Sequence, residues 1–184
     1  MVLTPDTLNP ASLENPHGYT LDFVGSDLLL PLAARYADAL SPTFIIEALA
    51  KGDQCFGVVY DGKLISFGWY SSKATEISEQ LTIGFSEKYV YMYKGYTVPE
   101  YRGHRLHALG MAHGLLAFSK RGFTGLVSYV EANNFSSLKS CERLGYKNIG
   151  KALIARVGKR HRIYMTAGCE KHQFEIREQA ALSV

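Results

Sequence analysis

Cysteine is scarce in this sequence of 184 residues, which contains only Cys55, Cys141 and Cys169. An odd and sparse set argues against a disulfide framework and is typical of proteins from a reducing compartment. The first 15 residues also lack the basic start and apolar run of a secretory signal. We therefore expect a cytoplasmic protein.

Long apolar runs are missing as well. The segment 28–34 is interrupted by Pro31 and is far shorter than the roughly 20 residues that cross a bilayer. The formal net charge of +3 is mild, so the chain lacks the basic excess of a nucleic-acid binder but can attract phosphates. The basic run 159–162 falls at an expected hairpin turn, where a solvated turn explains it. We expect neither a membrane nor a nucleic-acid partner.

The length and a hydrophobic content of 47% predict one domain that folds without disulfides or metals. Residues 1–18 contain three prolines (Pro5, Pro10 and Pro16) and little periodicity, which predicts a flexible N-terminal arm. The predicted domain covers 19–168. Residues 169–184 are expected to form a helical or frayed tail.

Hydrophobic periodicity predicts an alternation of helices and strands. Asp61-Gly62 between two β-rich runs is a strong hairpin signal, and Gly95 inside a later strand predicts a bulge or a close backbone approach. The expected order is helices 26–40 and 43–50, strands 54–60, 63–71 and 87–98, helix 104–120, strand 126–130, helix 135–144, and strands 146–157 and 162–167. The unit 89–130 is strand, helix, strand, which predicts a parallel strand pair with a right-handed crossover.

The loop between strand 87–98 and helix 104–120 contains the first chemical signal. A helix N-terminus presents unpaired N–H groups with a partial positive charge, and after a glycine-bearing loop it suits a pyrophosphate. Arg102 and Arg105 add positive charge beside it. The alternative is a plain connection in which Gly103 only makes the turn.

Two motifs together resemble the GNAT N-acetyltransferase superfamily. The run 97–107 resembles its coenzyme A loop, whose pattern is Arg or Gln, two residues, Gly, one residue, then Gly or Ala. Arg102 matches the first position, and the Pro-Glu-Tyr that precedes it also fits. The run 134–146 resembles the next motif of the family, in which an Asn begins a helix that closes in Leu-Gly-aromatic.

This resemblance implies an α/β (α+β) fold with a mixed, mostly antiparallel twisted sheet, flanking helices and two splayed parallel central strands. It also implies acetyl-CoA as cosubstrate, with backbone groups near the end of strand 87–98 holding the thioester carbonyl and lining the pantetheine arm. The cofactor-binding residues that it implies are Tyr96, Thr97, Val98, Arg102, Gly103, His104, Arg105, Leu106, His107, Asn134 and Ser137.

The sequence departs from the family pattern at three positions. Arg105 and His107 stand where the family usually has Gly and Gly or Ala, whose small size lets backbone amides approach the pyrophosphate. Cys141 occupies the helix position where many relatives have a tyrosine that protonates the leaving thiolate. A thiol can donate that proton in principle, because its pKa resembles that of the departing thiol. The alternative for Cys141 is a small buried core residue.

A base for the incoming amine is harder to find. Glu131 lies at the end of strand 126–130, beside the expected cleft, and is the catalytic candidate. A solvated charge at a strand end is the alternative. His104, His107 and His113 have no carboxylate at a known ligand spacing, so we expect no metal.

The sequence therefore predicts an N-acetyltransferase that moves an acetyl group from acetyl-CoA to a primary amine, either a small molecule or a peptide, in a ternary complex. Two alternatives stay open. One is an acyltransferase that uses a longer acyl-CoA or an acyl-carrier thioester, and the other is a catalytically silent coenzyme A-binding or interaction module. The acceptor and the formation of a homodimer are also open.

Overall fold

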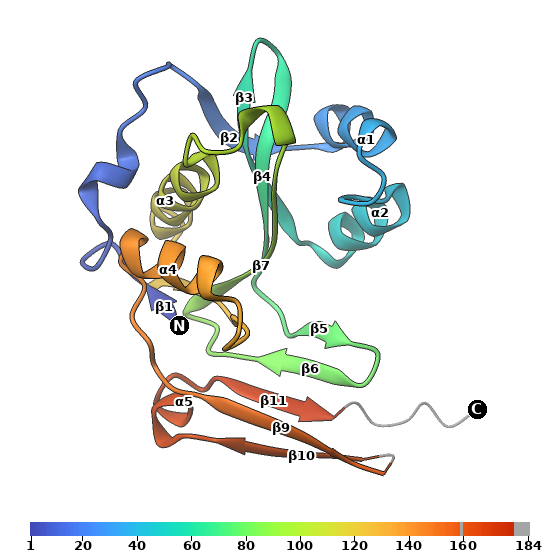
Figure 1. Ribbon diagram of the computed structural model, residues 1–184, viewed down its shortest axis with the longest axis vertical. Coiled ribbons are helices and arrows are strands. Elements are labelled where there is room, and N and C mark those ends of the chain that lie inside the picture. Colours follow the sequence, from blue (N-terminus) through green and yellow to red (C-terminus); the bar gives the residue numbers. More distant parts are fainter. Residues whose placement is uncertain (159, 179–184) are drawn as a thin grey trace.

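The computed structural model describes residues 1–158 and 160–178 (Figure 1). Its main sheet has six strands in the order β1-β8-β7-β4-β3-β2. All neighbours pair antiparallel except β7 and β8, which are parallel, so the predicted mixed and mostly antiparallel sheet is confirmed. The strands of this sheet are β1 (Val2–Leu3), β2 (Thr20–Val24), β3 (Gln54–Tyr60), β4 (Lys63–Ser71), β7 (Tyr89–Thr97) and β8 (Gly125–Val127).

The hairpin β3–β4 forms where the sequence predicted it. Asp61 and Gly62 have φ values of 50° and 69°, the left-handed pair that a tight two-residue turn requires. The β-rich segments on both sides of the turn then pair along their length, from Gln54↔Tyr70 to Tyr60↔Lys63. The sheet is thus built outward from this local hairpin.

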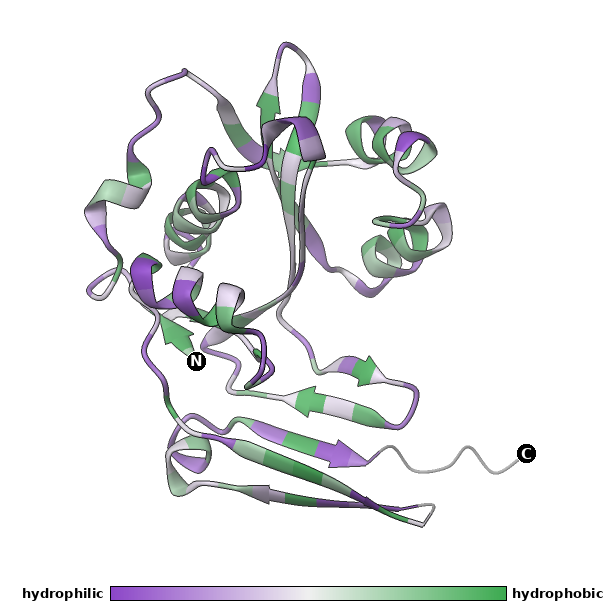
Figure 2. Ribbon diagram, in the orientation of Figure 1, coloured by the Kyte–Doolittle hydropathy of each residue, from purple (hydrophilic) through white to green (hydrophobic). Residues whose placement is uncertain are grey.

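Two pairs of helices cover the two faces of the main sheet (Figure 1). Helices α1 (Ser26–Arg35) and α2 (Pro42–Lys51) pack on one face, and α3 (Leu106–Ser119) and α4 (Phe135–Leu144) pack on the other. Helix α3 lies between the sheet and residues 1–19, and Figure 2 shows that it is largely hydrophobic, whereas α4 has a hydrophilic outer side. The short helix η2 (Pro99–Tyr101) bridges β7 and α3.

Helix α4 begins and ends where the sequence predicted. The side chain of Asn134 accepts a hydrogen bond from the N–H of Ser137 at 3.2 Å, which satisfies one unpaired amide of the first turn. Gly145 ends the helix with a φ of 109°. A side chain there would meet the carbonyl oxygen of Thr7 at 1.9 Å, so only glycine fits.

The flexible arm predicted for residues 1–18 is not what the structure contains. Val2 and Leu3 form β1, which pairs antiparallel with β8, and both side chains are buried. Residues Pro10–Leu13 form the short helix η1, and the Nε2 atom of His113 lies 3.2 Å from the carbonyl oxygen of Leu13. Prolines and weak periodicity hid a segment that is ordered by distant partners.

The C-terminal part forms two small sheets beside the main one. The predicted closing pair is β9 (Ala152–Val157) with β10 (Arg160–Met165), and it stands as a separate two-stranded sheet. The tail is helical at first, in α5 (Ala167–Lys171), but then forms β11 (Glu175–Glu178). β11 pairs with β6 (Leu81–Gly84) of a hairpin with β5 (Thr75–Ser78), which the sequence analysis missed. Residues 179–184 of the predicted tail, and Lys159 of the basic run, lie outside the described residues.

We predict that Leu3→Ala lowers the free energy of unfolding by about 3 kcal/mol, because it empties a fully buried site between β8 and α3. Urea denaturation monitored by circular dichroism measures this change. Leu30→Ala is the matched control, since Leu30 is 43% exposed on α1 and its loss changes stability by less than about 1 kcal/mol. Equal, small effects of the two substitutions would restore the flexible-arm interpretation.

Candidate functional site

The parallel strands β7 and β8 stay together for only three residue pairs, from Tyr89↔Gly125 to Tyr91↔Val127. β7 then continues to Thr97, while the chain after Val127 turns toward α4. A cavity of about 470 Å³, here called the central cavity, lies where the strands part. Its lining residues are Glu76, Ile77, Tyr91, Met92, Tyr93, Gly95, His107, Met111, Ser128, Tyr129, Val130, Glu131, Asn134, Ser137, Ser140 and Cys141.

The central cavity connects the two faces of the sheet. Met111 and Cys141 belong to the core cluster under α3 and α4, whereas Tyr93 packs in the cluster under α1 and α2. Residues of both clusters line the same space.

A β-bulge lies on the wall of this cavity. Trp69 is opposite Lys94 and Tyr70 is opposite Met92, so Tyr93 is the extra residue of β7. The sequence predicted a bulge or a close backbone approach at Gly95, two residues further along β7. A bulge interrupts the ladder and leaves a residue unpaired, which frees backbone groups at the edge of the cavity.

Gly95 provides the close approach instead. A Cβ atom there would lie 2.3 Å from Cε1 of His107, so the absent side chain of the strand makes room for the imidazole of the helix. His107 stands where the resemblance expects Gly or Ala, and Gly95 on the strand provides the space that its ring needs. Burial lowers the pKa of His107, which keeps the ring neutral at physiological pH.

The loop before α3 presents a row of free amides. The first bond of the helix runs from the N–H of Leu109 to the carbonyl oxygen of Arg105, at 3.0 Å. Within the described part of the chain, the N–H groups of 103–108 have no acceptor. Gly103 and Arg105 adopt left-handed φ values of 86° and 57°, so Arg105 keeps the backbone conformation that a glycine would adopt. Such an array of amides at a helix N-terminus attracts anions.

The predicted residues at the end of β7 are held in place by the structure. Arg102 donates from Nε to the carbonyl oxygen of Thr97 at 3.2 Å, and its guanidinium lies 5.7 Å from the ring centre of Tyr96. The N–H of Val98 is already used by the carbonyl oxygen of Ile65. None of these four residues lines the central cavity.

The other predicted residues divide between two cavities and the core. Leu106 is buried in the core, so only its backbone is available to a ligand. His104, Arg105 and His107 line a second cavity of about 580 Å³, here called the arm cavity, whose other walls are residues 9–19 and α4. Arg143 also lines it. The arm cavity is continuous with the row of free amides, since both contain the start of α3.

Both predicted catalytic residues line the central cavity. Cys141 is buried on α4, and burial raises the pKa of its thiol, which therefore stays protonated at neutral pH. Glu131 follows β8 and is exposed. Asn134 and Ser137 also line this cavity, where Asn134 caps α4.

Sequence reasoning missed several residues of the site. Glu76 and Ile77 belong to the overlooked strand β5, and Tyr129 lies two residues after the end of β8. Burial, followed by the charge of Glu131, raises the pKa of Tyr129. The tyrosines of strand 87–98 are a sequence signal for an aromatic-lined pocket, and two of them, Tyr91 and Tyr93, form an aromatic wall of this cavity.

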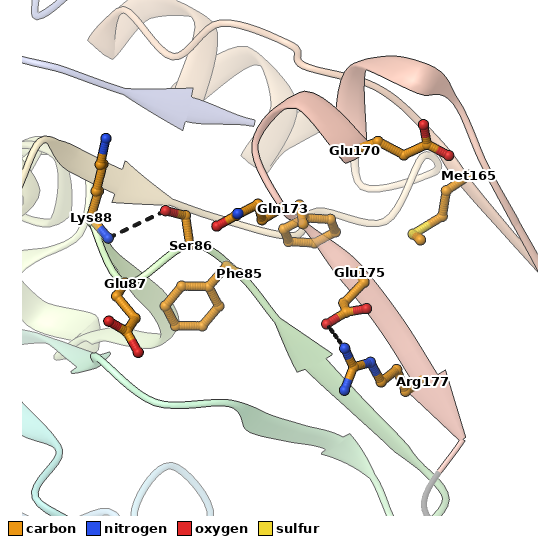
Figure 3. A pocket seen from close by; sticks show the side chains of 10 residues that line it. Phe85, Ser86, Glu87, Lys88, Met165, Glu170, Gln173, Glu175 and Arg177 are labelled. Atoms are coloured by element: carbon orange, nitrogen blue, oxygen red, sulfur yellow. Dashed lines mark hydrogen bonds and ion pairs between the residues drawn. The ribbon is translucent and has the colours of Figure 1, made fainter.

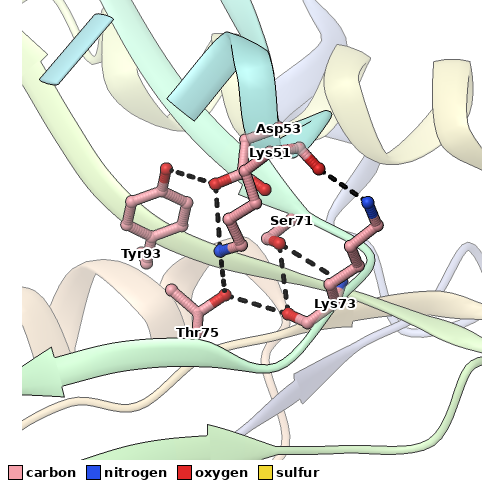
Figure 4. A network of polar contacts seen from close by, with 6 residues as sticks. All are labelled: Lys51, Asp53, Ser71, Lys73, Thr75 and Tyr93. Atoms are coloured by element: carbon pink, nitrogen blue, oxygen red, sulfur yellow. Dashed lines mark hydrogen bonds and ion pairs between the residues drawn. The ribbon is translucent and has the colours of Figure 1, made fainter. Parts of the chain in front are cut away.

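A buried network stands behind this wall (Figure 4). Asp53 is only 4% exposed. Its carboxylate accepts a hydrogen bond from the hydroxyl of Tyr93 at 2.8 Å and forms an ion pair with Lys51 at 3.2 Å. Lys51 also donates to the hydroxyl of Thr75 at 3.0 Å. This network fixes the position of Tyr93, because each buried polar group has a partner.

A larger cavity, about 880 Å³, lies elsewhere, between residues 85–88, which precede β7, and α5–β11 (Figure 3). Its lining contains charged residues of both signs, and Glu175 forms an ion pair with Arg177. It contains neither the start of α3 nor the point where β7 and β8 part, so it offers less chemistry than the central cavity.

Among residues 1–158 and 160–178, no group of three or more His, Cys, Asp or Glu side chains is placed to hold a metal ion. No helix in this part of the chain is both long and apolar enough to cross a membrane.

Solved structures with the same architecture are numerous, although no family profile and no curated protein match the sequence. An aminoglycoside N-acetyltransferase in complex with CoA is 17% identical, with a TM-score of 0.55 over 75% of this chain and 98% of that chain. A ribosomal-protein-alanine N-acetyltransferase from Brucella melitensis biovar Abortus 2308 is also 17% identical, with a TM-score of 0.54 over 75% and 99%. A transcriptional regulator from Bacillus halodurans C-125 is 12% identical, with a TM-score of 0.56 over 76% and 99%.

These likenesses define the fold, which is that of the GNAT N-acetyltransferases. The identities are too low to carry over an acceptor or a mechanism, and one of the three structures is described as a regulator. The predicted fold class and the predicted resemblance are confirmed.

We predict that Gly95→Ala lowers the free energy of unfolding by about 1–3 kcal/mol, because the new methyl group collides with the ring of His107. Adding His107→Ala removes the collision, so the double variant is more stable than the two single effects imply. Denaturation of all four proteins gives the coupling energy.

The matched control is Gly110→Ala. Gly110 lies inside α3, and a methyl group there makes only an ordinary contact with Val58 at 3.4 Å, so stability stays level or rises. If the effects of the substitutions at positions 95 and 107 are additive, the claim that Gly95 makes room for the ring of His107 is wrong.

Proposed function

We propose that this protein is an N-acetyltransferase that transfers an acetyl group from acetyl-CoA to a primary amine. The observation that supports it best is the central cavity, which passes through the sheet where β7 and β8 separate and has a row of free amides near one end. An anionic cofactor and an amine can meet there from opposite faces. The GNAT fold of neighbours that are named as N-acetyltransferases supports the same activity.

The cofactor would lie along three features in sequence. Its pyrophosphate would rest against the free amides of 103–108, next to the positive end of α3. Its nucleotide end would occupy the arm cavity, where Arg105 and Arg143 offer charge for phosphate oxygens. Its pantetheine arm would follow the unpaired edge of β7 into the central cavity, past Gly95 and His107.

The reaction requires an attack by a neutral amine on the thioester carbonyl carbon. A carbon–nitrogen bond forms, the carbon–sulfur bond breaks, and the acyl oxygen becomes negative in between. Backbone N–H groups at the bulge of Tyr93 would stabilise that oxygen. Glu131 would take the ammonium proton, directly or through water, and the thiol of Cys141 would give a proton to the leaving sulfur.

We predict that isothermal titration with acetyl-CoA gives saturable binding at micromolar to millimolar concentration, the range of ordinary cosubstrates. A thiol-release assay across a panel of primary amines then tests transfer. Binding without turnover would favour the silent coenzyme A-binding module, an alternative to which the cysteine at position 141 points. No binding at millimolar ligand would reject both.

Cys141→Ala is expected to lower kcat about tenfold while the KM for acetyl-CoA changes less than about threefold. The reason is that a proton donor acts in the breakdown step, not in binding. Cys55→Ala is the matched control, because Cys55 is also buried but packs under α1 and α2 and does not line the central cavity. A kcat within twofold of the unmodified enzyme would assign Cys141 to the core alone.

A further inference from the structure

The arm cavity and the central cavity differ in charge. At the arm cavity, Arg105 and Arg143 outnumber the single carboxylate of Glu14. In the central cavity the formal charges are both negative and belong to Glu76 and Glu131, and the lining contains no lysine or arginine. Its histidine, His107, is the neutral ring packed against Gly95.

Three lysines lie near the central cavity, but each is occupied elsewhere. Lys51 is paired with Asp53, as Figure 4 shows. Lys73 donates to the carbonyl oxygen of Lys51 at 2.7 Å, and Lys94 lies over the ring of Phe44 at 5.1 Å. None of the three lines the cavity. The N-terminal ammonium of Met1 lies closer, since it donates to the carbonyl oxygen of Ser128 at 2.9 Å, so one positive charge stands beside the two carboxylates.

The aromatic wall adds shape rather than charge. The rings of Tyr91 and Tyr93 stack at 5.8 Å with an angle of 19° between their planes. Phe85 lies against Tyr91, and the ammonium of Lys51 lies over Tyr93 at 5.8 Å. Both tyrosine rings are therefore already covered by a neighbouring side chain. The aromatic wall suits a methylene chain better than it suits a second cation.

Resting on the proposed function, we propose that the acceptor is an aliphatic diamine or polyamine. One nitrogen receives the acetyl group, and another stays an ammonium ion that is held by Glu76, with its methylene chain along Tyr91 and Tyr93. Glu76 is then a specificity residue, because it contacts the amine that does not react. Attraction of a cation to carboxylates at one opening also keeps the acceptor away from the basic opening of the cofactor.

Three amines with a four-carbon chain test this inference: 1,4-diaminobutane, butylamine and 4-aminobutanoate. They differ at the far end by an ammonium, a methyl and a carboxylate group. We expect kcat/KM to fall in that order, with the diamine at least tenfold above butylamine. Glu76→Gln should lower kcat/KM for the diamine about fivefold, and for butylamine by a clearly smaller factor.

Glu47→Gln is the matched control, because Glu47 is an exposed carboxylate on α2 and lines no described cavity. It should leave the order and the ratios as they are. In about 0.5 M salt the advantage of the diamine should shrink, since exposed charges are screened.

The possible outcomes separate the two proposals. The acceptor class is wrong, and the transferase function stands, if kcat/KM for butylamine or 4-aminobutanoate equals that for the diamine. The same holds if Glu76→Gln does not change the ratio of kcat/KM between the diamine and butylamine. If acetyl-CoA binds but none of the three amines causes release of the CoA thiol, both the acceptor class and the proposed catalysis are wrong. If acetyl-CoA does not bind, the proposed function fails first.

Discussion

The structure depends on how briefly β7 and β8 stay paired. Three residue pairs hold these parallel strands together, and beyond Tyr91 and Val127 each strand leaves the other. Continued pairing would close the sheet and fill the central cavity. Because pairing stops, the edge of β7 that lines the central cavity keeps backbone groups without a partner strand. A bound ligand is the natural partner for such groups.

The start of α3 shows how a motif can change its side chains and keep its backbone. Arg105 adopts the left-handed conformation that glycine favours, and His107 fits because Gly95 on the neighbouring strand has no side chain. The free amides thus survive two substitutions that looked unfavourable in the sequence. What matters to an anion is where the N–H groups point, and the structure preserves that feature.

Local signals were enough to predict part of the fold. The Asp61-Gly62 hairpin, the capped helix α4 and the strand–loop–helix around Gly103 follow from turn and capping chemistry, which acts over a few residues. The strands β1, β2, β5, β6 and β11 were missed because they are short and depend on partners elsewhere in the chain. Glu76 was missed for the same reason, since no local pattern places β5 beside the cavity. The catalytic candidates Cys141 and Glu131 were found from motif position, and the structure brings both to one cavity.

The pairing of β1 with β8 has a consequence for how the molecule assembles. Val2 lies beside Val127, so the edge of the main sheet next to the parallel pair is formed by segments 125 residues apart in sequence. Such a contact forms only after a large entropy of loop closure has been overcome, and it tends to form late. During synthesis the hairpin β3–β4 can fold early, whereas the second residue of the chain waits for its partner until most of the protein has been made. The architecture of the site would then be among the last features to become native.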